Sequence, residues 1–422
     1  MLEKVNFKIL EDLHLGSNPI KNLNILQNVK FEELKKLDLG FIKSNFNILE
    51  KVNFPKLEIL NLKDNNISNI EFLENLKFNE LKILNLSDNK IIDIKVLAKV
   101  NFKKLVELDL VSNQILDIKV LENVNFRNLE ILGIDDNKIS DIKVLEKVKF
   151  EKLKKLGIGH IKIKDINILE KVNFKELKEL YLYDNNISDI NILERVDFKE
   201  LRELFLSSNK ISNLNVFKNT NFIKLKELYL YGNNISDVDI LRQVNFPELK
   251  DLLLHDNTIY QVTIYGDHKL EKLKSLILSH CNLEHIIAFQ GASLKNLERL
   301  DLSFNSLSNI DELGNINFEK LKELDLSENV IKNINGLGKM NLKKLEFLNL
   351  GYNQISNINV LKKVNFEKLK ELYLHNNKIS NIKIFENFDL KQIIKLNLQC
   401  NKIDKKSTIL NKLKSKLKEF VI

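Results

Sequence analysis

The stretch LKELYLYDNNISDINILERVDFKE, residues 177–200, is one copy of a unit that returns every 24 residues along the chain. The shared pattern is L-x-x-L-x-L-x-x-N-x-I-x-x-I-x-x-L-x-x-V-x-F-x-x. Seventeen copies, 24 residues apart except for one step of 23, begin at Leu10, Leu34, Leu57, Leu81, Leu105, Leu129, Leu153, Leu177, Leu201, Leu225, Leu249, Leu273, Leu297, Leu321, Leu345, Leu369 and Ile393. A unit this short cannot bury its own apolar face, so the copies must stack and share one continuous core.

The two halves of the unit predict different structures. The opening L-x-x-L-x-L alternates apolar with variable residues, which is typical of a strand with one buried and one exposed face. Stacked copies of this strand form a parallel sheet. Behind the strand, apolar residues recur at every third position, as at Ile187, Ile190 and Leu193. That spacing suits 3₁₀ turns, which Ser188 and Asp189 can cap.

An asparagine follows the strand in most units, as at Asn185. Its amide both donates and accepts hydrogen bonds, so it can satisfy buried turn groups that would otherwise cost about 1–3 kcal/mol each. We therefore predict that these asparagines are structural and bind nothing. Ile42 and Ile161 replace the asparagine, and the unit from Leu249 departs most, with YGDH at 265–268 where leucine and valine are expected.

The pattern resembles the leucine-rich repeat family, over essentially the whole chain. The N-x-I-x-x-I-x-x-L that follows the strand is similar to an intracellular subclass whose best-known member is the leucine-rich repeat regulator of protein phosphatase 1. The resemblance to that regulator extends to architecture only, because the V-x-F segment here departs from its pattern. It implies an α/β solenoid, a leucine-rich repeat horseshoe with a parallel sheet on the concave face and short 3₁₀ or helical turns on the convex face.

The ends and the composition indicate how the chain is organised. Residues 1–406 are predicted to form one array of about 17 units, because the chain has only three prolines and no low-complexity linker. Residues 407–422 are predicted to form a C-terminal capping helix, with Ile409, Leu410, Leu413 and Leu417 at helical spacing. No run of about 18 apolar residues could span a bilayer. We expect a monomer.

The two cysteines and the N-terminus predict a cytoplasmic protein. Cys281 and Cys400 lie five predicted strands apart, so they would be roughly 24 Å from each other, beyond disulfide reach. Residues 1–7 are charged and lack the apolar stretch of a secretory signal. A reducing compartment is the expected location.

The sequence predicts no enzyme, no cofactor and no small-molecule substrate. It contains no G-x-G-x-x-G, P-loop, paired-cysteine or G-x-S-x-G motif. One constellation of possible metal ligands groups His255, Asp256, His268, His280 and His285. Only three of these end neighbouring strands on the exposed face, so no four-ligand set emerges and we predict no metal site.

The repeat phase places the third, fifth, seventh and eighth residues of each unit on the concave face. Nineteen of these residues are acidic and only five are basic, whereas the whole chain carries a net charge of +8. An acidic groove repels phosphate and attracts a positively charged protein surface. We therefore expect a basic or mixed-charge protein partner, not nucleic acid, and a solubilising coat of lysines on the flanks and back.

Aromatic residues locate the predicted partner site. They occupy the fifth and seventh positions of consecutive units, beside a column of carboxylates at the third position. These are the residue types that dominate interface hot spots, although an exposed sheet face also favours tyrosine and phenylalanine for pairing alone. The predicted partner-binding residues are Tyr181, Tyr183, Phe205, Tyr229, Tyr231, Leu253, Glu179, Glu203, Glu227 and Asp251. A weaker second patch is Phe304, Phe347, Tyr352 and Tyr373.

The leading hypothesis is a non-enzymatic interaction scaffold, of which a phosphatase regulator is one concrete form. Two alternatives stay open. One is an extracellular adhesion or virulence protein similar to the internalins, which use the same kind of concave face. The other is a nucleic-acid or ribonucleoprotein factor that uses the basic flank.

Overall fold

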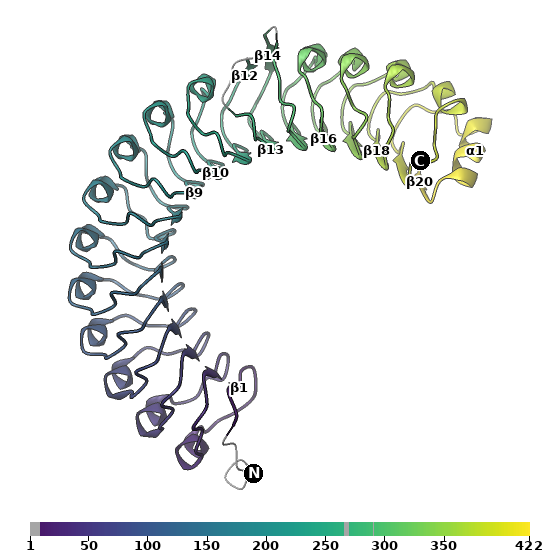
Figure 1. The fold of residues 1–422 in the computed structure, drawn as a ribbon. Helices are drawn as coiled ribbons and strands as arrows, with labels where there is room; N and C mark the ends of the chain where they lie inside the picture. Colours follow the sequence, from purple (N-terminus) through teal and green to yellow (C-terminus); the bar gives the residue numbers. More distant parts are fainter. Residues whose placement is uncertain (1–8, 266–269, 290) are drawn as a thin grey trace. The chain divides into compact units, whose positions relative to one another are not determined.

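The computed structural model describes residues 9–265, 270–289 and 291–422. The chain divides into two compact units, unit 1 (Met1–Asn209) and unit 2 (Lys210–Ile422). Each unit is curved, with strands along its inner side and helical turns along its outer side (Figure 1). No helix in the described ranges is long and apolar enough to cross a bilayer.

Unit 1 alternates strands with 3₁₀ helices. Its strands, in register with partners one repeat along the chain, are β1 (Asp12–His14), β2 (Lys36–Asp38), β3 (Ile59–Asn61), β4 (Ile83–Asn85), β5 (Glu107–Asp109), β6 (Ile131–Gly133), β7 (Lys155–Gly157), β8 (Glu179–Tyr181) and β9 (Glu203–Phe205). Its 3₁₀ helices are η2 (Asn24–Asn28), η3 (Asn47–Lys51), η4 (Glu71–Asn75), η5 (Lys95–Ala98), η6 (Lys119–Glu122), η7 (Lys143–Glu146), η8 (Asn167–Glu170) and η9 (Asn191–Glu194). Every described strand pair of this unit is parallel.

Unit 2 repeats the same alternation with one break. Its sheet strands are β10 (Glu227–Tyr229), β11 (Asp251–Leu253), β13 (Ser275–Ile277), β15 (Arg299–Asp301), β16 (Glu323–Asp325), β17 (Phe347–Asn349), β18 (Glu371–Tyr373), β19 (Lys395–Asn397) and β20 (Glu419–Val421). Its 3₁₀ helices are η10 (Asn215–Lys218), η11 (Asp239–Arg242), η12 (Asp311–Asn315), η13 (Asn335–Lys339), η14 (Asn359–Lys363) and η15 (Lys383–Glu386). Between η11 and η12, two short strands, β12 (Gln261–Ile264) and β14 (His285–Ala288), pair with each other instead.

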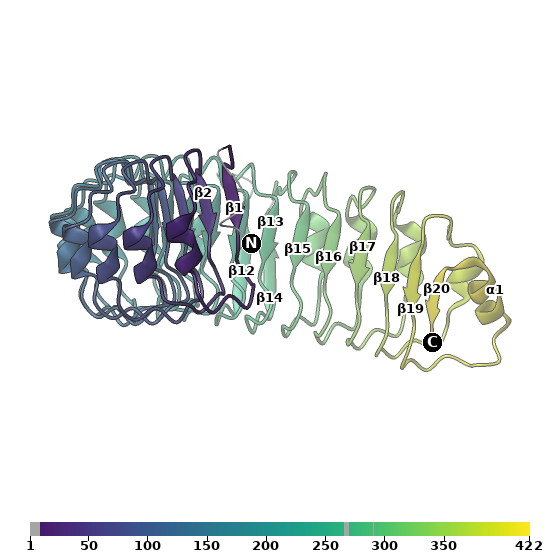
Figure 2. The same cartoon turned by 90° about the horizontal axis from the view of Figure 1, so that it is seen from below.

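The C-terminal segment contains less helix than predicted. Helix α1 spans Thr408–Lys416, and the following residues form β20, which pairs in parallel with β19. Figure 2 shows α1 beside β20 at the end of unit 2. The helix ends because Leu417 adopts an extended conformation (φ −101°, ψ 142°) that continues into the strand. Ile409, Leu410 and Leu413 are buried, as the apolar spacing predicted.

The core lies between the sheet and the helical turns, where the repeat phase placed it. The strand leucines are fully buried, for example Leu180 and Leu182 at 0% exposure. The phenylalanine near the end of the unit forms a second buried column, in which Phe31 and Phe54 lie with ring centroids 5.6 Å apart. The phenylalanine of the V-x-F segment is therefore a core residue of the repeat.

The asparagine after the strand connects neighbouring repeats by hydrogen bonds. Asn113 Nδ2 donates to Leu86 O, Leu110 O and Val111 O, and its Oδ1 accepts from Ile91 N one repeat earlier. The structural role predicted for these asparagines is confirmed. Cys281 occupies the same slot and its Sγ lies 3.2 Å from Leu254 O, so a thiol partly replaces the amide there.

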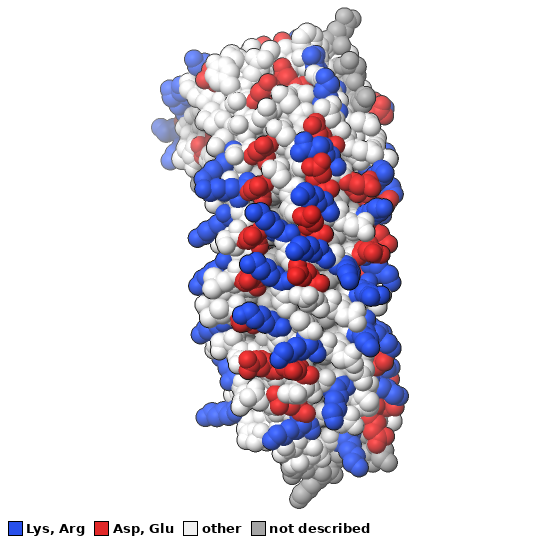
Figure 3. Space-filling view, turned by 90° about the vertical axis from the view of Figure 1, so that its left-hand side faces the viewer, with Lys and Arg blue, Asp and Glu red and all other residues white. Residues whose placement is uncertain are grey.

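The outer face of unit 1 carries rows of opposite charges (Figure 3). Lys99, Lys147 and Lys171 pair with the glutamates Glu74, Glu122 and Glu146 of the preceding repeats, at 3.0, 3.4 and 3.7 Å. The back is therefore a mixed-charge surface rather than a purely basic one.

Asp189 Oδ1 accepts from Asn191 N at 2.8 Å and so caps the 3₁₀ turn, as predicted for the aspartate of the Ser-Asp pair.

The fold class predicted from the sequence is confirmed: a leucine-rich repeat solenoid with a parallel sheet on the concave side and 3₁₀ turns on the convex side of each unit.

Candidate protein-binding surface

The concave patch of unit 1 is built from residues 179–205. Glu179 and Tyr181 lie on β8, and Glu203 and Phe205 lie on β9. The strands alternate, so Leu180 and Leu204 point into the core while these four side chains point to the concave surface. All four are half-buried. Tyr183, two residues after β8, is half-buried beside them.

Tyr181 is the centre of this patch. Its ring stacks on Phe205 with centroids 4.3 Å apart and planes 8° from parallel. Lys155 Nζ lies 4.6 Å from the Tyr181 centroid and 3.1 Å from Glu179 Oε2. The Tyr181 hydroxyl donates to Glu179 at 3.1 Å. The aromatic pair is therefore held rigid by a cation and a carboxylate, which lowers the entropy that a binding partner must overcome.

Tyr183 lies over a gap left by glycines. A side chain on Gly159 would meet the Tyr183 ring at 2.7 Å, and the carboxylate of Asp135 fills the space above Gly157. Asp135 is only 7% exposed, and its Oδ1 accepts from Gly159 N at 2.7 Å. Burial raises the pKa of Asp135 to about 6, and burial together with Asp135 raises the pKa of Tyr183 to about 12. Burial also raises the pKa of Tyr181 to about 12, so both tyrosines keep their protons at neutral pH.

Replacing Gly157 with alanine is expected to destabilise unit 1 by about 1–3 kcal/mol, because overpacking a filled site displaces its neighbours. The new Cβ would lie 1.8 Å from Asp135 Oδ2, and Asp135 is held by the Gly159 amide. Thermal unfolding of Gly157→Ala measures the loss. In an Asp135→Ala background the same substitution should cost much less. An equal cost in both backgrounds would exclude the Asp135 contact as the cause.

Unit 2 carries its own patch on β10 and β11. Glu227, Tyr229, Asp251 and Leu253 are strand residues, and Tyr231 follows β10; all five are half-buried. The Tyr229 hydroxyl donates to Glu227 at 2.7 Å. Burial, followed by the nearby Glu227, raises the pKa of Asp251. This patch therefore presents the same residue types as the patch of unit 1.

A histidine that the site prediction did not include, His255, enlarges the aromatic surface at Tyr231. The Tyr231 ring stacks on His255 with centroids 4.4 Å apart. Burial lowers the pKa of His255, and its Nδ1 is buried with no hydrogen-bond partner among the described residues. His255 is therefore a neutral ring that enlarges the aromatic surface.

The charge of the concave face is partly neutralised within the structure. Each of its five basic residues pairs with an acidic residue of a neighbouring repeat: Lys36 with Asp12, Lys63 with Asp88, Lys155 with Glu179, Arg299 with Glu323 and Lys395 with Glu419. Several aspartates instead accept a backbone N–H two residues ahead, as Asp109 does from Val111 at 3.0 Å. Four of the nineteen acidic side chains, Asp12, Asp88, Glu179 and Glu323, are therefore already paired with a basic side chain of the same face.

The residues of the second patch and of the histidine group make aromatic contacts with one another. Phe347 and Tyr373 lie with centroids 5.5 Å apart, and Phe304 and Tyr352 are each 48% exposed. His280 stacks on Phe304 and His285 meets the edge of Tyr260. His268 lies outside the described residues. Within the described ranges, no group of three or more histidine, cysteine, aspartate or glutamate side chains is placed to hold a metal ion.

Three residues that shape the unit 1 patch were missed: Lys155, Asp135 and Gly159. A signal for them was present in the sequence, because Gly157-Ile158-Gly159 puts glycine at two of the four concave positions of one unit, the fifth and the seventh. The residues on either side must then fill the space. That gap brings Asp135 and Tyr183 together across the missing side chains.

Comparisons with known proteins agree with this architecture. Residues 175–219 match the family model "Leucine Rich repeats (2 copies)" and residues 295–355 match "Leucine rich repeat". No curated protein sequence matches the chain. Neither the family matches nor the structures described below support the narrower resemblance to the phosphatase regulator.

Three solved structures are similar. A leucine-rich repeat protein of Leptospira interrogans is 23% identical, with a TM-score of 0.69 over 96% of this chain and 94% of its own. The internalin InlF of Listeria monocytogenes is 26% identical, with a TM-score of 0.59 over 81% of this chain and 86% of its own. The ectodomain of the Arabidopsis thaliana receptor kinase GASSHO1/SCHENGEN3, in complex with CASPARIAN STRIP INTEGRITY FACTOR 2, is 21% identical, with a TM-score of 0.66 over 95% of this chain and 48% of its own. By its repeats, its two family matches and its fold, the chain is similar to leucine-rich repeat proteins.

Proposed function

We propose that this protein is a non-enzymatic scaffold that binds a basic or mixed-charge protein partner on its concave surface. The observation that carries the proposal is the stacked pair of Tyr181 and Phe205, half-buried on the sheet and flanked by Glu179 and Glu203. Tyrosine enriched at a rigid, partly desolvated centre is typical of interface hot spots. The patch of Tyr229, Tyr231 and His255 in unit 2 offers the same chemistry.

Lys155 supports the choice of a basic partner group for this patch. Its ammonium lies over the Tyr181 ring and against Glu179, so the protein itself provides an example of a cation held by an aromatic face and a carboxylate. A lysine or arginine of a partner would find the same pairing at the carboxylates of this column. We therefore favour a partner segment that carries both basic and apolar side chains.

Tyr181→Ala/Phe205→Ala is expected to weaken partner binding by about 2 kcal/mol or more, roughly 30-fold in Kd, because the variant removes the aromatic anchors. The partner is first identified by affinity purification and mass spectrometry with the wild-type protein. Its Kd is then measured with the purified proteins, and circular dichroism confirms the fold of each variant.

The matched control is Lys138→Glu/Lys143→Glu on the back of unit 1, where both lysines are exposed and neither has an ion pair among the described contacts. This variant should bind as the wild type does. If it loses binding while the aromatic variant keeps it, the partner uses the back of the molecule and the concave proposal is wrong.

One alternative is supported by a specific observation. The similarity to internalin InlF, at 26% identity, favours an adhesion protein displayed outside a cell. The concave patches would then face a host protein. Fractionation of the source cells decides between the two locations, since a cytoplasmic scaffold remains with the soluble fraction.

The nucleic-acid alternative receives less support. Flank lysines that could contact phosphate pair with glutamates instead, as Lys82 does with Glu58 at 2.8 Å and Lys154 with Glu130 at 2.7 Å. Paired lysines release fewer counterions on binding and contribute less to nucleic-acid affinity.

A further inference from the structure

Two exposed aromatic side chains of unit 2, Phe304 and Tyr352, lie on either side of Glu328. The three residues follow β15, β16 and β17, which lie side by side (Figure 2). Phe304 N donates to Ser327 O and Glu328 N donates to Gly351 O, both at 3.0 Å, so the three residues form one row across consecutive repeats. Strands about 4.8 Å apart put the Cα atoms of Phe304 and Tyr352 roughly 10 Å from each other.

The repeat does not require aromatic residues in this row. Phe304 and Tyr352 have φ angles of 54° and 53°, in the left-handed region that is unfavourable for bulky side chains. Each ring is also 48% exposed, so burial does not offset that cost. Strained residues of this kind cluster at binding sites. Most other repeats have a shorter residue at this position: Ser17, Asp64, Asp88, Ser112, Asp136, Asp184, Ser208, Gly232, Asp256 and Asn376.

The Phe304 ring turns one face toward Glu328. His280 occupies the same position one repeat earlier and stacks on Phe304, with centroids 4.2 Å apart and planes 12° from parallel. A ring that stacks on the residue before it in the row points its other face at the residue after it, which is Glu328. At the other end, His375 of the following repeat meets the Tyr352 ring at 84°, with centroids 5.1 Å apart. Both rings are therefore held from outside the space between them.

Elsewhere in the protein, a cation occupies the meeting point of an aromatic ring and a carboxylate. Lys155 Nζ lies 4.6 Å from the Tyr181 centroid and 3.1 Å from Glu179 Oε2. In the row of unit 2, no lysine or arginine of the described residues lies over either ring, and Glu328 forms no ion pair with them. The row therefore offers two aromatic rings and a half-buried carboxylate to a cation from another molecule.

We propose that the slot between Phe304 and Tyr352 receives an arginine side chain of a protein partner, with its guanidinium between the rings and paired with Glu328. A cation midway along the row lies about 5 Å from each ring, within the roughly 6 Å reach of cation–π contacts. Arginine fits better than lysine, because its planar guanidinium stacks on rings and binds a carboxylate through two N–H groups. Val330, 39% exposed, offers apolar surface to the rest of the partner segment. The slot lies entirely within unit 2 and does not depend on the aromatic pair of unit 1.

A single tryptophan at the slot tests the proposal. The chain contains no tryptophan, so the emission of Tyr352→Trp reports on this site alone. Titration with the peptide acetyl-Ala-Arg-Ala-amide is expected to give a saturable change in that emission, in the millimolar range. The corresponding citrulline peptide, which has nearly the same shape without the charge, should give none, and the lysine peptide should bind more weakly. Phe304→Trp, on the other side of the slot, should report the same Kd for the arginine peptide.

Phe41→Trp is the matched control. Phe41 has the same position in its repeat, a φ of 60° and 47% exposure, and Asp64 follows it in the row, but the next residue of the row is Asp88 and not a second aromatic. This variant should bind the arginine peptide at least about tenfold more weakly than Tyr352→Trp, because a second cation–π contact and its desolvation are missing.

Two further variants in the Tyr352→Trp background test the other walls of the slot. Glu328→Gln should weaken binding of the arginine peptide about tenfold by removing a charge-assisted contact. Phe304→Ser should also weaken it and should keep the unfolding temperature, because Ser112 and Ser208 occupy the same position in other repeats. Equal responses to the arginine and citrulline peptides, equal binding by Tyr352→Trp and Phe41→Trp, or unaltered binding by both Glu328→Gln and Phe304→Ser overturns the proposal. Equal binding of the lysine peptide overturns the choice of arginine.

Discussion

Replacing Asn185 with alanine is expected to lower the free energy of unfolding by about 3–6 kcal/mol, because three buried backbone groups lose their partner. Asn185 Oδ1 accepts from Ile161 N and Ile163 N at 3.1 and 3.2 Å, and its Nδ2 donates to Ile158 O at 2.9 Å. None of these three groups has another hydrogen-bond partner within the described contacts. Ile161 stands where other repeats have an asparagine, so Asn185 satisfies backbone groups that two asparagines share in other repeats.

Asn113→Ala is the matched comparison in the same unit. Leu86 O also accepts from Asn89 Nδ2, Leu110 O from Asn137 Nδ2 and Val111 O from Asp88 N. Only Ile91 N would lose its described partner, so we expect a loss of about 1–3 kcal/mol. Urea unfolding of the two variants gives the difference. Equal losses at both positions would show that the asparagines act through packing and not through the groups they satisfy.

The period of 24 residues was enough to predict the fold, because the position within the repeat decides whether a side chain is buried. Leu182 and Ile187 are fully buried, and Tyr181 lies on the exposed side of its strand, as the alternation required. The asparagine ladder followed from the need to satisfy turn amides. Each of these predictions depends on one residue and its sequence position alone.

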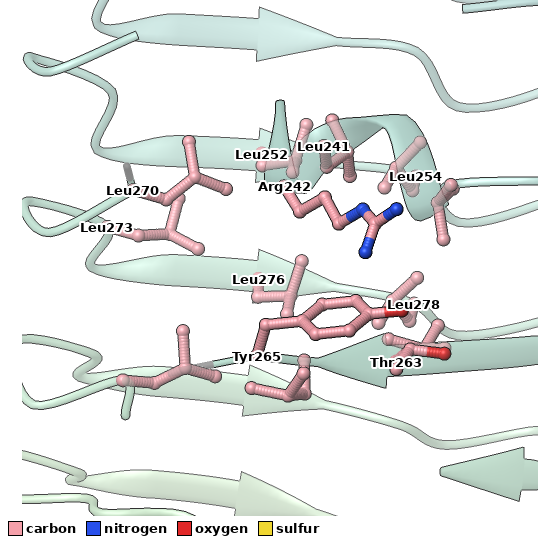
Figure 4. A pocket seen from close by; sticks show the side chains of 14 residues that line it. Leu241, Arg242, Leu252, Leu254, Thr263, Tyr265, Leu270, Leu273, Leu276 and Leu278 are labelled. Carbon is pink, nitrogen blue, oxygen red and sulfur yellow. The ribbon is translucent and has the colours of Figure 1, made fainter. Parts of the chain in front are cut away.

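Features that depend on pairs of residues from different repeats could not be predicted in this way. The contact of Lys155 with the Tyr181 ring joins side chains 26 positions apart. The sequence assigned each of the two residues to the concave face, but it did not show that they touch. A small cavity in unit 2 is lined by Leu270 and Leu294 (Figure 4), which replace the buried phenylalanine in two consecutive repeats and so remove volume together. Whether such a loss leaves a cavity or is refilled depends on how far neighbouring side chains move, and the repeat pattern does not contain that information.

The charge of the concave face shows the same limit. Nineteen acidic residues were assigned to it from the repeat phase. Asp109 and Asp325 belong to that set, but burial raises the pKa of both carboxyls and each accepts a backbone N–H. Their role is partly structural. Sequence position alone does not distinguish a carboxylate that faces a partner from one that closes a turn.

Asp135→Asn is expected to stabilise the protein by about 2–3 kcal/mol at pH 8 and to change its stability little at pH 4. Burial raises the pKa of Asp135 from 3.8 to about 6 in the folded protein, so the folded state binds the proton more tightly than the unfolded state. Stability therefore falls as the pH rises from about 4 to about 6 and then levels off. A shift of about two pKa units corresponds to about 3 kcal/mol.

Asparagine keeps the oxygen that accepts from Gly159 N but carries no charge, so it mimics the protonated aspartate at every pH. The surrounding charges are consistent with a raised pKa of Asp135, because Asp109 disfavours the Asp135 carboxylate and Lys155 only partly offsets the effect of burial. Urea unfolding of wild type and variant at pH 4 and pH 8 measures the effect. Asp141→Asn is the control, because Asp141 is exposed and its capping bond to Lys143 N is one that asparagine makes elsewhere in the array. An equal stability difference between variant and wild type at pH 4 and pH 8 would show that folding does not raise the pKa of Asp135, and a variant that is less stable than wild type mainly at pH 8 would show that the carboxylate stabilises the fold.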